Sequence, residues 1–276
     1  MTDRAILITG CSSGIGRCSA DGLKARGYRV FATARKQADV DTLKTEGHES
    51  FRLDLADSAS IRDGVGAVLD ATNGKLYGLF NNGAYGQPGA VEDLTREALR
   101  EQFETNLFGT HELTTLIIPV MRGQEEGRII QNSSVLGFAA MPFRGAYSAS
   151  KYALEGLTDT LRLELHDTGI YLSLIEPGPI LSKFRDNAYA KFKKHIEPAS
   201  SCHRPRYEAM EARLQKVGPA QPFTLGPEAV LKRVIHALEA KRPKERYYVT
   251  FPTYLFGGLK RILPDRALDA ILRRIN

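Results

Sequence analysis

The sequence predicts an α/β fold in which one doubly wound parallel sheet is covered by helices on both faces. Short apolar runs alternate with helical stretches along the chain, and this alternation favours right-handed βαβ units. The 276 residues suffice for one large domain, residues 1–276, with a sizeable core. Glycine-rich and polar segments follow the apolar runs directly, at the strand ends where such a Rossmann-type sheet binds its ligand.

Four apolar runs form the first half of the predicted sheet. These strands are expected at residues 5–9, 29–34, 51–53 and 77–81. Helices should connect or follow them at residues 14–26, 58–71 and 99–120. Gly27 closes the first of these helices, and Pro119 is tolerated in the third because it lies at the helix end.

The second half of the sheet should be built in the same way. One helix carries Tyr147 and Lys151 and stops at Gly169. A last helix should precede the final strand, at residues 227–241. The remaining strands are expected at residues 128–131, 170–175 and 247–249.

Two segments depart from this alternation. Residues 181–225 are rich in Lys, Arg, Pro and aromatics without a clean period, and they are too long for an idle loop. We expect this segment to be a substrate lid. Residues 255–276 mix Leu, Ile and Phe with Lys and Arg, which predicts a basic amphipathic tail.

The net charge of +6 is concentrated near the C-terminus, because residues 227–276 contain eleven Lys/Arg and five Asp/Glu. Two interpretations stand: a solvated helix face, or a peripheral contact of the tail with an anionic membrane surface. A nucleic-acid partner is not expected, because no aromatic platform or known binding motif accompanies the basic residues.

The composition is typical of a protein in a reducing compartment. The N-terminal residues do not resemble a signal peptide, and no apolar stretch approaches the ~18 residues that a membrane span needs. Cys11, Cys18 and Cys202 are odd in number and lack metal spacing, and the six histidines form no H-x-x-x-H pair. We therefore expect a cytoplasmic protein with free thiols and no metal site.

A glycine-rich turn follows the first strand, where residues 9–16 read T-G-C-S-S-G-I-G. Gly10, Gly14 and Gly16 let the backbone turn sharply and approach a pyrophosphate without a Cβ in the way. The helix behind the turn offers its N-terminal N–H groups and positive dipole end to phosphates. The turn is interpreted as a dinucleotide site, although its G-x-x-x-G-x-G spacing differs from the common G-x-G-x-x-G fingerprint.

The residues after the second predicted strand indicate which dinucleotide binds. Residues 32–36 read A-T-A-R-K and contain no carboxylate for a ribose 2′-hydroxyl. Arg35 can instead hold a 2′-phosphate, so we predict NADP(H) as the cofactor, with Ser12 or Ser13 adding a hydroxyl contact. Asp54, which follows the third strand, either accepts from the adenine amino group or caps the next helix.

Tyr147 and Lys151 lie about one helical turn apart, so their side chains are neighbours on the helix. A tyrosine has a pKa of about 10, and a nearby ammonium should lower it toward the working range. Tyr147 is therefore the candidate general acid and base, and Lys151 can also hold the nicotinamide ribose. Ser134 can donate to the developing oxyanion, although its neighbour Ser133 competes for that role.

With these motifs the chain resembles the short-chain dehydrogenase/reductase family over about residues 5–180. Within the family it is similar to the branch of 17β-hydroxysteroid and retinol dehydrogenases and related bacterial aldehyde reductases. Residues 83 and 84 read Gly-Ala where the family has Ala-Gly. The family motifs correspond here to residues 9–16, residues 81–84, Asn106, Ser134, Tyr147 with Lys151, and Pro177 with Gly178.

The resemblance implies a tetrad of Asn106, Ser134, Tyr147 and Lys151, in which Asn106 holds a water that links Lys151 to a proton relay. Family members are commonly dimers or tetramers, so a homo-oligomer is expected. The residues expected to bind the cofactor are Gly10, Ser12, Ser13, Gly14, Ile15, Gly16, Arg35, Asp54, Asn82, Gly83, Tyr147, Lys151, Pro177, Gly178 and Ile180.

A lipophilic substrate is expected, because apolar and aromatic residues surround the candidate site. They are Phe138, Met141, Phe143, Phe184, Tyr189 and Phe192. The predicted function is NADP(H)-dependent hydride transfer to or from a lipophilic carbonyl or alcohol, such as an aldehyde, a retinoid or a steroid. The alternative is a catalytically idle NADP-sensing or interaction protein on the same fold, which loss of Tyr147 or Lys151 would have favoured.

Overall fold

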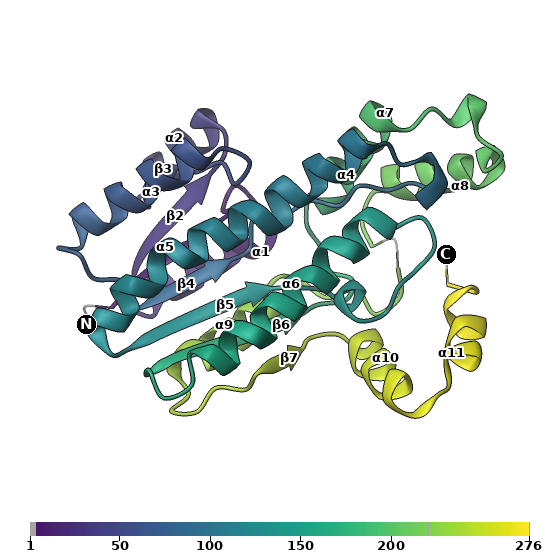
Figure 1. Ribbon diagram of the computed structural model, residues 1–276. Helices are drawn as coiled ribbons and strands as arrows, with labels where there is room; N and C mark the ends of the chain where they lie inside the picture. Colours follow the sequence, from purple (N-terminus) through teal and green to yellow (C-terminus); the bar gives the residue numbers. More distant parts are fainter. Residues whose placement is uncertain (1–3, 220, 276) are drawn as a thin grey trace.

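A seven-stranded parallel sheet runs through the centre of the protein, whose computed structural model describes residues 4–219 and 221–275 (Figure 1). The strand order is β3-β2-β1-β4-β5-β6-β7, so the direction of winding reverses between β1 and β4. Every neighbouring pair is parallel, which confirms the predicted doubly wound fold. The strands are β1 Ala5–Ile8, β2 Arg29–Ala34, β3 Glu49–Arg52, β4 Gly78–Asn81, β5 Gly127–Asn132, β6 Ile170–Glu176 and β7 Arg246–Tyr248.

Helices cover both faces of the sheet because successive strand residues point to opposite sides. Ile6 and Ile8 belong to one core cluster with Val234, and Leu7 belongs to the other with Leu113. This burial on both faces explains why the strands read as continuous apolar runs. The helices of the first face are α1 Gly14–Ala25, α2 Gln37–Thr45 and α9 Glu228–Glu239, and those of the second are α3 Ser58–Ala71, α5 Gly109–Gln124 and α6 Gly145–Glu164.

The helix predicted at residues 99–120 is present, but it is longer and contains a π-helical turn. It consists of α4 (Arg96–Phe103), the π-helical turn (Glu104–Phe108) and α5, which follow one another without a break. Helix α5 continues past Pro119 to Gln124, because Ile117 and Met121 are fully buried on either side of the proline. Their packing outweighs the one backbone hydrogen bond that the proline removes.

Two smaller differences lie in the first half of the sheet. Helix α2 was not predicted, because its nine residues bury only Val40 and Leu43 and so show little apolar periodicity. Strand β3 begins at Glu49, before the apolar residues that marked it in the sequence.

The predicted lid is more regular than its sequence indicates. Residues 181–225 contain α7 (Phe184–His195) and α8 (Arg204–Gln215), which pack on each other through Phe192 and Tyr207. Both of these side chains are fully buried. The charged residues that dominate the two helices hide this contact in the sequence.

The predicted amphipathic tail is two helices instead of one, α10 (Phe251–Ile262) and α11 (Asp265–Leu272). Pro264 separates them because it lacks the backbone N–H that a continuous helix needs. Leu268 and Leu272 of α11 are buried in a small core cluster at the end of the sheet. Among the described residues, no helix has the length and apolar character needed to cross a bilayer.

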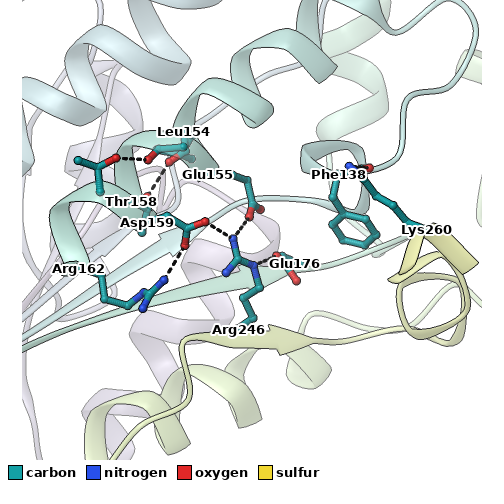
Figure 2. A network of polar contacts seen from close by, with 11 residues as sticks. Phe138, Leu154, Glu155, Thr158, Asp159, Arg162, Glu176, Arg246 and Lys260 are labelled. Atoms are coloured by element: carbon teal, nitrogen blue, oxygen red, sulfur yellow. Dashed lines mark hydrogen bonds and ion pairs between the residues drawn. The ribbon is translucent and has the colours of Figure 1, made fainter. Parts of the chain in front are cut away.

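An ion-pair network joins β7 to β6 and α6 (Figure 2). Arg246 Nη2 lies 3.1 Å from Glu155 Oε2 and 2.7 Å from Asp159 Oδ2, and Arg246 Nε lies 3.1 Å from Glu176 Oε1. Glu155 and Glu176 are buried and hydrogen-bonded to each other, which requires a proton on one of them. Burial and the charge of Glu155 raise the pKa of Glu176, so the Glu176 carboxyl holds that proton.

Replacement of Arg246 by Met should lower the free energy of unfolding by about 3 kcal/mol, because it leaves buried carboxylate charge without its cation. Urea titration of Arg246→Met measures this loss. The control is Arg26→Met, which removes an exposed bidentate pair with Glu239 and should cost about 1 kcal/mol or less. Equal losses in the two variants would contradict the structural role of the network.

Candidate active site

The glycine turn after β1 is shaped by close backbone contacts. Gly10 and Gly14 have φ angles of +72° and +57°, in the left-handed region that glycine adopts at least cost. A Cβ on Gly16 would lie 2.3 Å from the Gly10 carbonyl oxygen, so only glycine fits there without a shift of the backbone. Ser13, the N-cap of α1, makes no side-chain cap hydrogen bond to the described residues, which leaves the first N–H groups of α1 for a phosphate.

A chain of hydrogen bonds ties this turn to the neighbouring strand ends. Asn82 Nδ2 donates to the carbonyl oxygens of Thr9 (3.0 Å) and Gly10 (3.2 Å). Asn132 Nδ2 donates to Asn82 Oδ1 over 3.0 Å, and Lys151 Nζ donates to the Asn132 carbonyl oxygen over 2.6 Å. The ends of β1, β4 and β5 and helix α6 are thereby held together. Asn132 was not among the predicted site residues.

The chain of hydrogen bonds ends at Lys151, and Tyr147 lies one turn earlier on α6. Lys151 is only 2% exposed, and burial lowers the pKa of its ammonium to about 8. Tyr147 is partly exposed because it lines a cavity, and the Phe184 ring packs against it edge-on with centroids 5.3 Å apart. Enclosure by the protein raises the pKa of Tyr147 to about 12, and a hydrogen bond with Ser134 acts in the opposite direction.

The predicted lowering of the Tyr147 pKa by Lys151 is therefore wrong for this structure. Lys151 Nζ lies 5.7 Å from the centre of the Tyr147 ring and donates to Asn132. Desolvation of the phenolate outweighs the Ser134 hydrogen bond, so Tyr147 keeps its proton at neutral pH. A neutral phenol is the form that can donate a proton.

The geometry favours Ser134 over Ser133 as the partner of Tyr147. Ser134 hydrogen-bonds with Tyr147. The Ser133 hydroxyl is turned away, because a Cβ built on Gly137 would lie 2.5 Å from Ser133 Oγ and 2.8 Å from Glu155 Oε1. Ser133 thus faces the ion-pair network beneath the site.

Asn106 lies behind the catalytic pair instead of in the cavity wall. It is buried in the π-helical turn, where its side chain accepts from the Tyr85 N–H (3.1 Å) and donates to the Tyr85 carbonyl oxygen (2.9 Å). Its Nδ2 also donates to Ser150 Oγ (3.2 Å), which donates to the Tyr147 carbonyl oxygen (2.8 Å). These contacts position α6, while the water relay through Asn106 stays a prediction.

The strand ends, the lid and α10 surround a cavity of about 600 Å³. It brings the glycine turn and the catalytic pair into one space, of a size typical of ligand sites. The predicted residues that line it are Gly10, Ser12, Ser13, Gly14, Ile15, Asn82, Gly83, Ser134, Tyr147, Lys151, Pro177, Gly178 and Ile180. The predicted residues outside its lining are Gly16, Arg35, Asp54 and Asn106.

Arg35 and Asp54 follow strands at one side of the glycine turn. Arg35 is exposed directly after β2, and its carbonyl oxygen accepts from Arg52 Nε over 3.3 Å. Asp54 Oδ1 accepts from the Ala56 N–H (3.1 Å) and closes a turn. The helix-cap alternative for Asp54 is wrong, because Asp57 caps α3.

The Gly-Ala order at residues 83 and 84 fits the local packing. The Gly83 N–H donates to Thr9 Oγ1 over 2.9 Å. A Cβ on Gly83 would lie 3.1 Å from Leu55 Cδ1 and 3.3 Å from Thr9 Oγ1, which leaves little room for a side chain. The glycine at this position thus allows β4 to lie close to the end of β1.

The apolar wall of the cavity agrees only in part with the sequence prediction. Met141, Phe143 and Phe184 line it as predicted. The predicted residues Phe138, Tyr189 and Phe192 pack into core clusters and do not line it. The wall residues that the prediction missed include several from α8, the end of the lid and α10, namely Leu214, Phe223, Phe251, Leu255 and Phe256.

Three possible metal ligands meet outside this cavity, although no sequence spacing indicates them. Glu92, Cys202 and His203 bring ligand atoms within 4.8 Å of one another in the described part of the chain. His203 Nε2 contacts Glu92 Oε1 directly, so hydrogen bonding already satisfies these groups. Cys202 and His203 lie in a turn of the lid, whereas Glu92 lies in a short 3-10 turn about 110 residues earlier in the chain, so no local spacing indicates the cluster.

The fold and the site define a nicotinamide-dependent oxidoreductase, and comparisons with known proteins give its family. The family model described as short chain dehydrogenase matches residues 4–192. The chain belongs to the short-chain dehydrogenase/reductase family.

Similar proteins extend over nearly the whole chain. The uncharacterized oxidoreductase YbbO of Escherichia coli K12 is 42% identical over 270 residues, which cover 98% of this chain and 94% of YbbO. The NADPH-dependent 3-dehydrocapnine reductase of Ornithobacterium rhinotracheale is 32% identical, with 97% and 95% covered. A short-chain dehydrogenase from Burkholderia phymatum in complex with NAD is 25% identical with a TM-score of 0.78, over 99% and 96% of the two chains. These relatives support a nicotinamide cofactor.

The close contact between Gly16 and the Gly10 carbonyl oxygen predicts that a methyl group at residue 16 weakens coenzyme binding. Gly16→Ala should weaken binding of reduced nicotinamide dinucleotide about tenfold or more, because the new Cβ forces the Gly10 carbonyl and the turn to move. Titration of coenzyme fluorescence measures the affinity. The control is Gly66→Ala on α3, where a Cβ meets nothing within 4 Å and binding should stay unchanged. Unaltered binding by Gly16→Ala would place the phosphates elsewhere.

Proposed function

We propose that this protein is an NADP(H)-dependent oxidoreductase that transfers hydride between the nicotinamide and a lipophilic carbonyl or alcohol, with Tyr147 as general acid and base. One observation carries the proposal: the Tyr147 phenol, the Lys151 ammonium and the glycine turn share one cavity, in which Asn132 and Asn82 link Lys151 to the turn. A bound nicotinamide would supply or accept the hydride, and the chain itself supplies proton chemistry and positioning.

The residues around Tyr147 support a proton transfer to a carbonyl oxygen. A phenol with a pKa of about 12 carries its proton at neutral pH, so it serves reduction directly. Ser134 can donate a hydrogen bond to the oxygen on which negative charge develops. The Lys151 ammonium, with a pKa of about 8, stays mostly charged at pH 7 and can donate to the ribose hydroxyls of a bound nicotinamide.

The preference for NADP(H) rests on the end of β2. Arg35 is exposed there, and residues 32–36 hold no carboxylate that would repel a 2′-phosphate. A relative whose name states NADPH dependence supports the same choice. The end of β2 lies beside the glycine turn, because the Cys11 N–H donates to the Thr33 carbonyl oxygen over 2.8 Å.

The preference for a lipophilic substrate rests on the cavity wall. Apolar side chains from the lid and α10 form much of it, including Phe184, Phe223, Phe251 and Leu255. Phe184 contacts the Tyr147 ring, so the apolar wall reaches the reacting group. An aldehyde, retinoid or steroid-like ketone has the apolar surface that such a wall can bury.

Tyr147→Phe should lower kcat for carbonyl reduction by a factor of about 10² to 10⁴, because it removes the proton donor and one catalytic acid contributes about that much. Oxidation of NADPH, followed by absorbance, with aldehydes, retinal and ketosteroids is the measurement. The affinity for NADPH should hardly change. Tyr152→Phe on the same helix is the control, because Tyr152 points to solvent and should keep full activity. Wild-type protein that binds NADPH but reduces no carbonyl would favour the idle, NADP-sensing alternative.

Arg35→Gln should lower kcat/KM about tenfold or more with NADPH and leave the value with NADH nearly unchanged, because only NADPH has the 2′-phosphate. Steady-state kinetics with both coenzymes test this. The control is Arg122→Gln on α5, which removes a similarly exposed charge away from β2. An equal effect on both coenzymes would contradict the role given to Arg35.

A further inference from the structure

Large apolar side chains are exposed on the end of the lid and on α10. Val217 is 95% exposed, Phe223 58%, Phe251 56%, Leu255 42% and Ile262 79%. We call these five residues the apolar rim. The end of the lid and α10 are separated in the chain by α9 and β7, and the contact between the Phe223 and Phe251 rings brings them together. Exposed apolar groups gathered in this way mark an interaction surface.

The rim continues into the catalytic cavity. Phe223, Phe251 and Leu255 line the cavity and are also exposed to solvent, so they stand at its mouth. The rings of Phe223 and Phe251 lie 5.0 Å apart and join the lid to α10. A lipophilic molecule that enters here passes from the rim to Tyr147 over apolar side chains.

Helix α10 presents its apolar stripe outward. Phe251, Leu255 and Ile262 lie four and seven residues apart, on one side of the helix. Its other side, with Thr253 and Phe256, is buried against the protein. The stripe therefore adds nothing to the core.

Helix α11 has the opposite arrangement. Its apolar residues Leu268 and Leu272 are buried in the core cluster of Phe256, so the tail does not offer the free amphipathic face that its sequence indicates. What the tail offers is positive charge. Arg261, Arg266, Arg273 and Arg274 are exposed, and no carboxylate of the described residues lies within ion-pair distance of them.

We infer that the apolar rim docks on an anionic lipid bilayer, with the arginines of α10 and α11 against the headgroups. The rim can bury its side chains at the boundary of headgroups and acyl chains, and unpaired guanidinium groups complement a negative surface. The cavity mouth then faces the membrane interior, from which a lipophilic carbonyl substrate enters. This last step rests on the proposed function, whereas docking by itself does not.

Flotation with lipid vesicles tests the docking. The full-length protein should bind vesicles of phosphatidylcholine with phosphatidylglycerol, and only weakly bind vesicles of phosphatidylcholine alone. About 1 M salt, where the screening length is about 3 Å, should release most of it. Arg266→Gln/Arg273→Gln/Arg274→Gln should lower the partition coefficient about tenfold or more, since each cation near such a surface is worth about 1 kcal/mol. Val217→Ser/Ile262→Ser should lower it by a comparable factor.

Matched variants separate docking from general charge and hydrophobicity. Arg96→Gln/Arg100→Gln/Arg122→Gln removes the same charge from α4 and α5, and Leu163→Ser removes an apolar side chain that is 70% exposed on α6. Both should bind vesicles like the wild type. Equal losses in these controls, or binding that ignores the rim and tail variants, would overturn the inference.

Turnover of a short, water-soluble aldehyde without vesicles measures the proposed function independently. The rim and tail variants should keep it, because none of the substituted residues lines the cavity. Active protein that does not bind vesicles would overturn docking alone, and bound protein that reduces no carbonyl would overturn the proposed function alone. Rim variants that change the sedimentation coefficient in place of vesicle binding would identify the surface as a contact between two copies of the chain, and would also overturn docking.

Discussion

The hydrogen bond from Asn132 Nδ2 to Asn82 Oδ1 joins the ends of β4 and β5 at the level of the cavity. An amide suits this place because it donates and accepts at once. Through Asn82 the bond reaches the Gly10 carbonyl of the phosphate turn, and through the Asn132 backbone it reaches Lys151. Three polar contacts, one buried and two partly buried, therefore set the position of the coenzyme turn relative to the catalytic helix, and the rest of the site depends on that spacing.

Helix α6 carries two buried charged side chains, Lys151 and Glu155. Burial lowers the pKa of Lys151, and the carboxylate of Glu155 on the next turn of α6 acts against that lowering. Glu155 is held by Arg246, which also holds Glu176 at the end of β6 (Figure 2). The network beneath the site thus keeps the Glu155 carboxylate near Lys151, where it favours the charged ammonium. It also holds the end of β6, the strand that leads into Pro177 and Gly178. A lysine in this position can remain charged only while its neighbours stay in place.

Catalytic residues and substrate-facing apolar residues lie in different parts of the molecule. The sheet and its helices carry the coenzyme turn, Tyr147 and Lys151, whereas the lid and the C-terminal helices carry the apolar wall and the apolar rim. The first part is close-packed on both faces and tolerates little change. The second part buries fewer side chains, so it is the part in which substrate choice and surface contacts can vary without disturbing the catalytic geometry.

The sequence by itself determined the parallel sheet, the glycine turn and the Tyr147–Lys151 pair, because these depend on periodicity, backbone freedom and spacing within one or two elements. Only the tertiary structure decided that Ser134 faces Tyr147 while Ser133 faces Glu155, that Phe192 is core while Phe223 is wall, and that Asn132 connects the site. It also reversed the expected pKa of Tyr147, which depends on how much water the distant lid residue Phe184 and its neighbours exclude. Contacts between residues far apart in the chain, and the desolvation they cause, leave no local pattern to read.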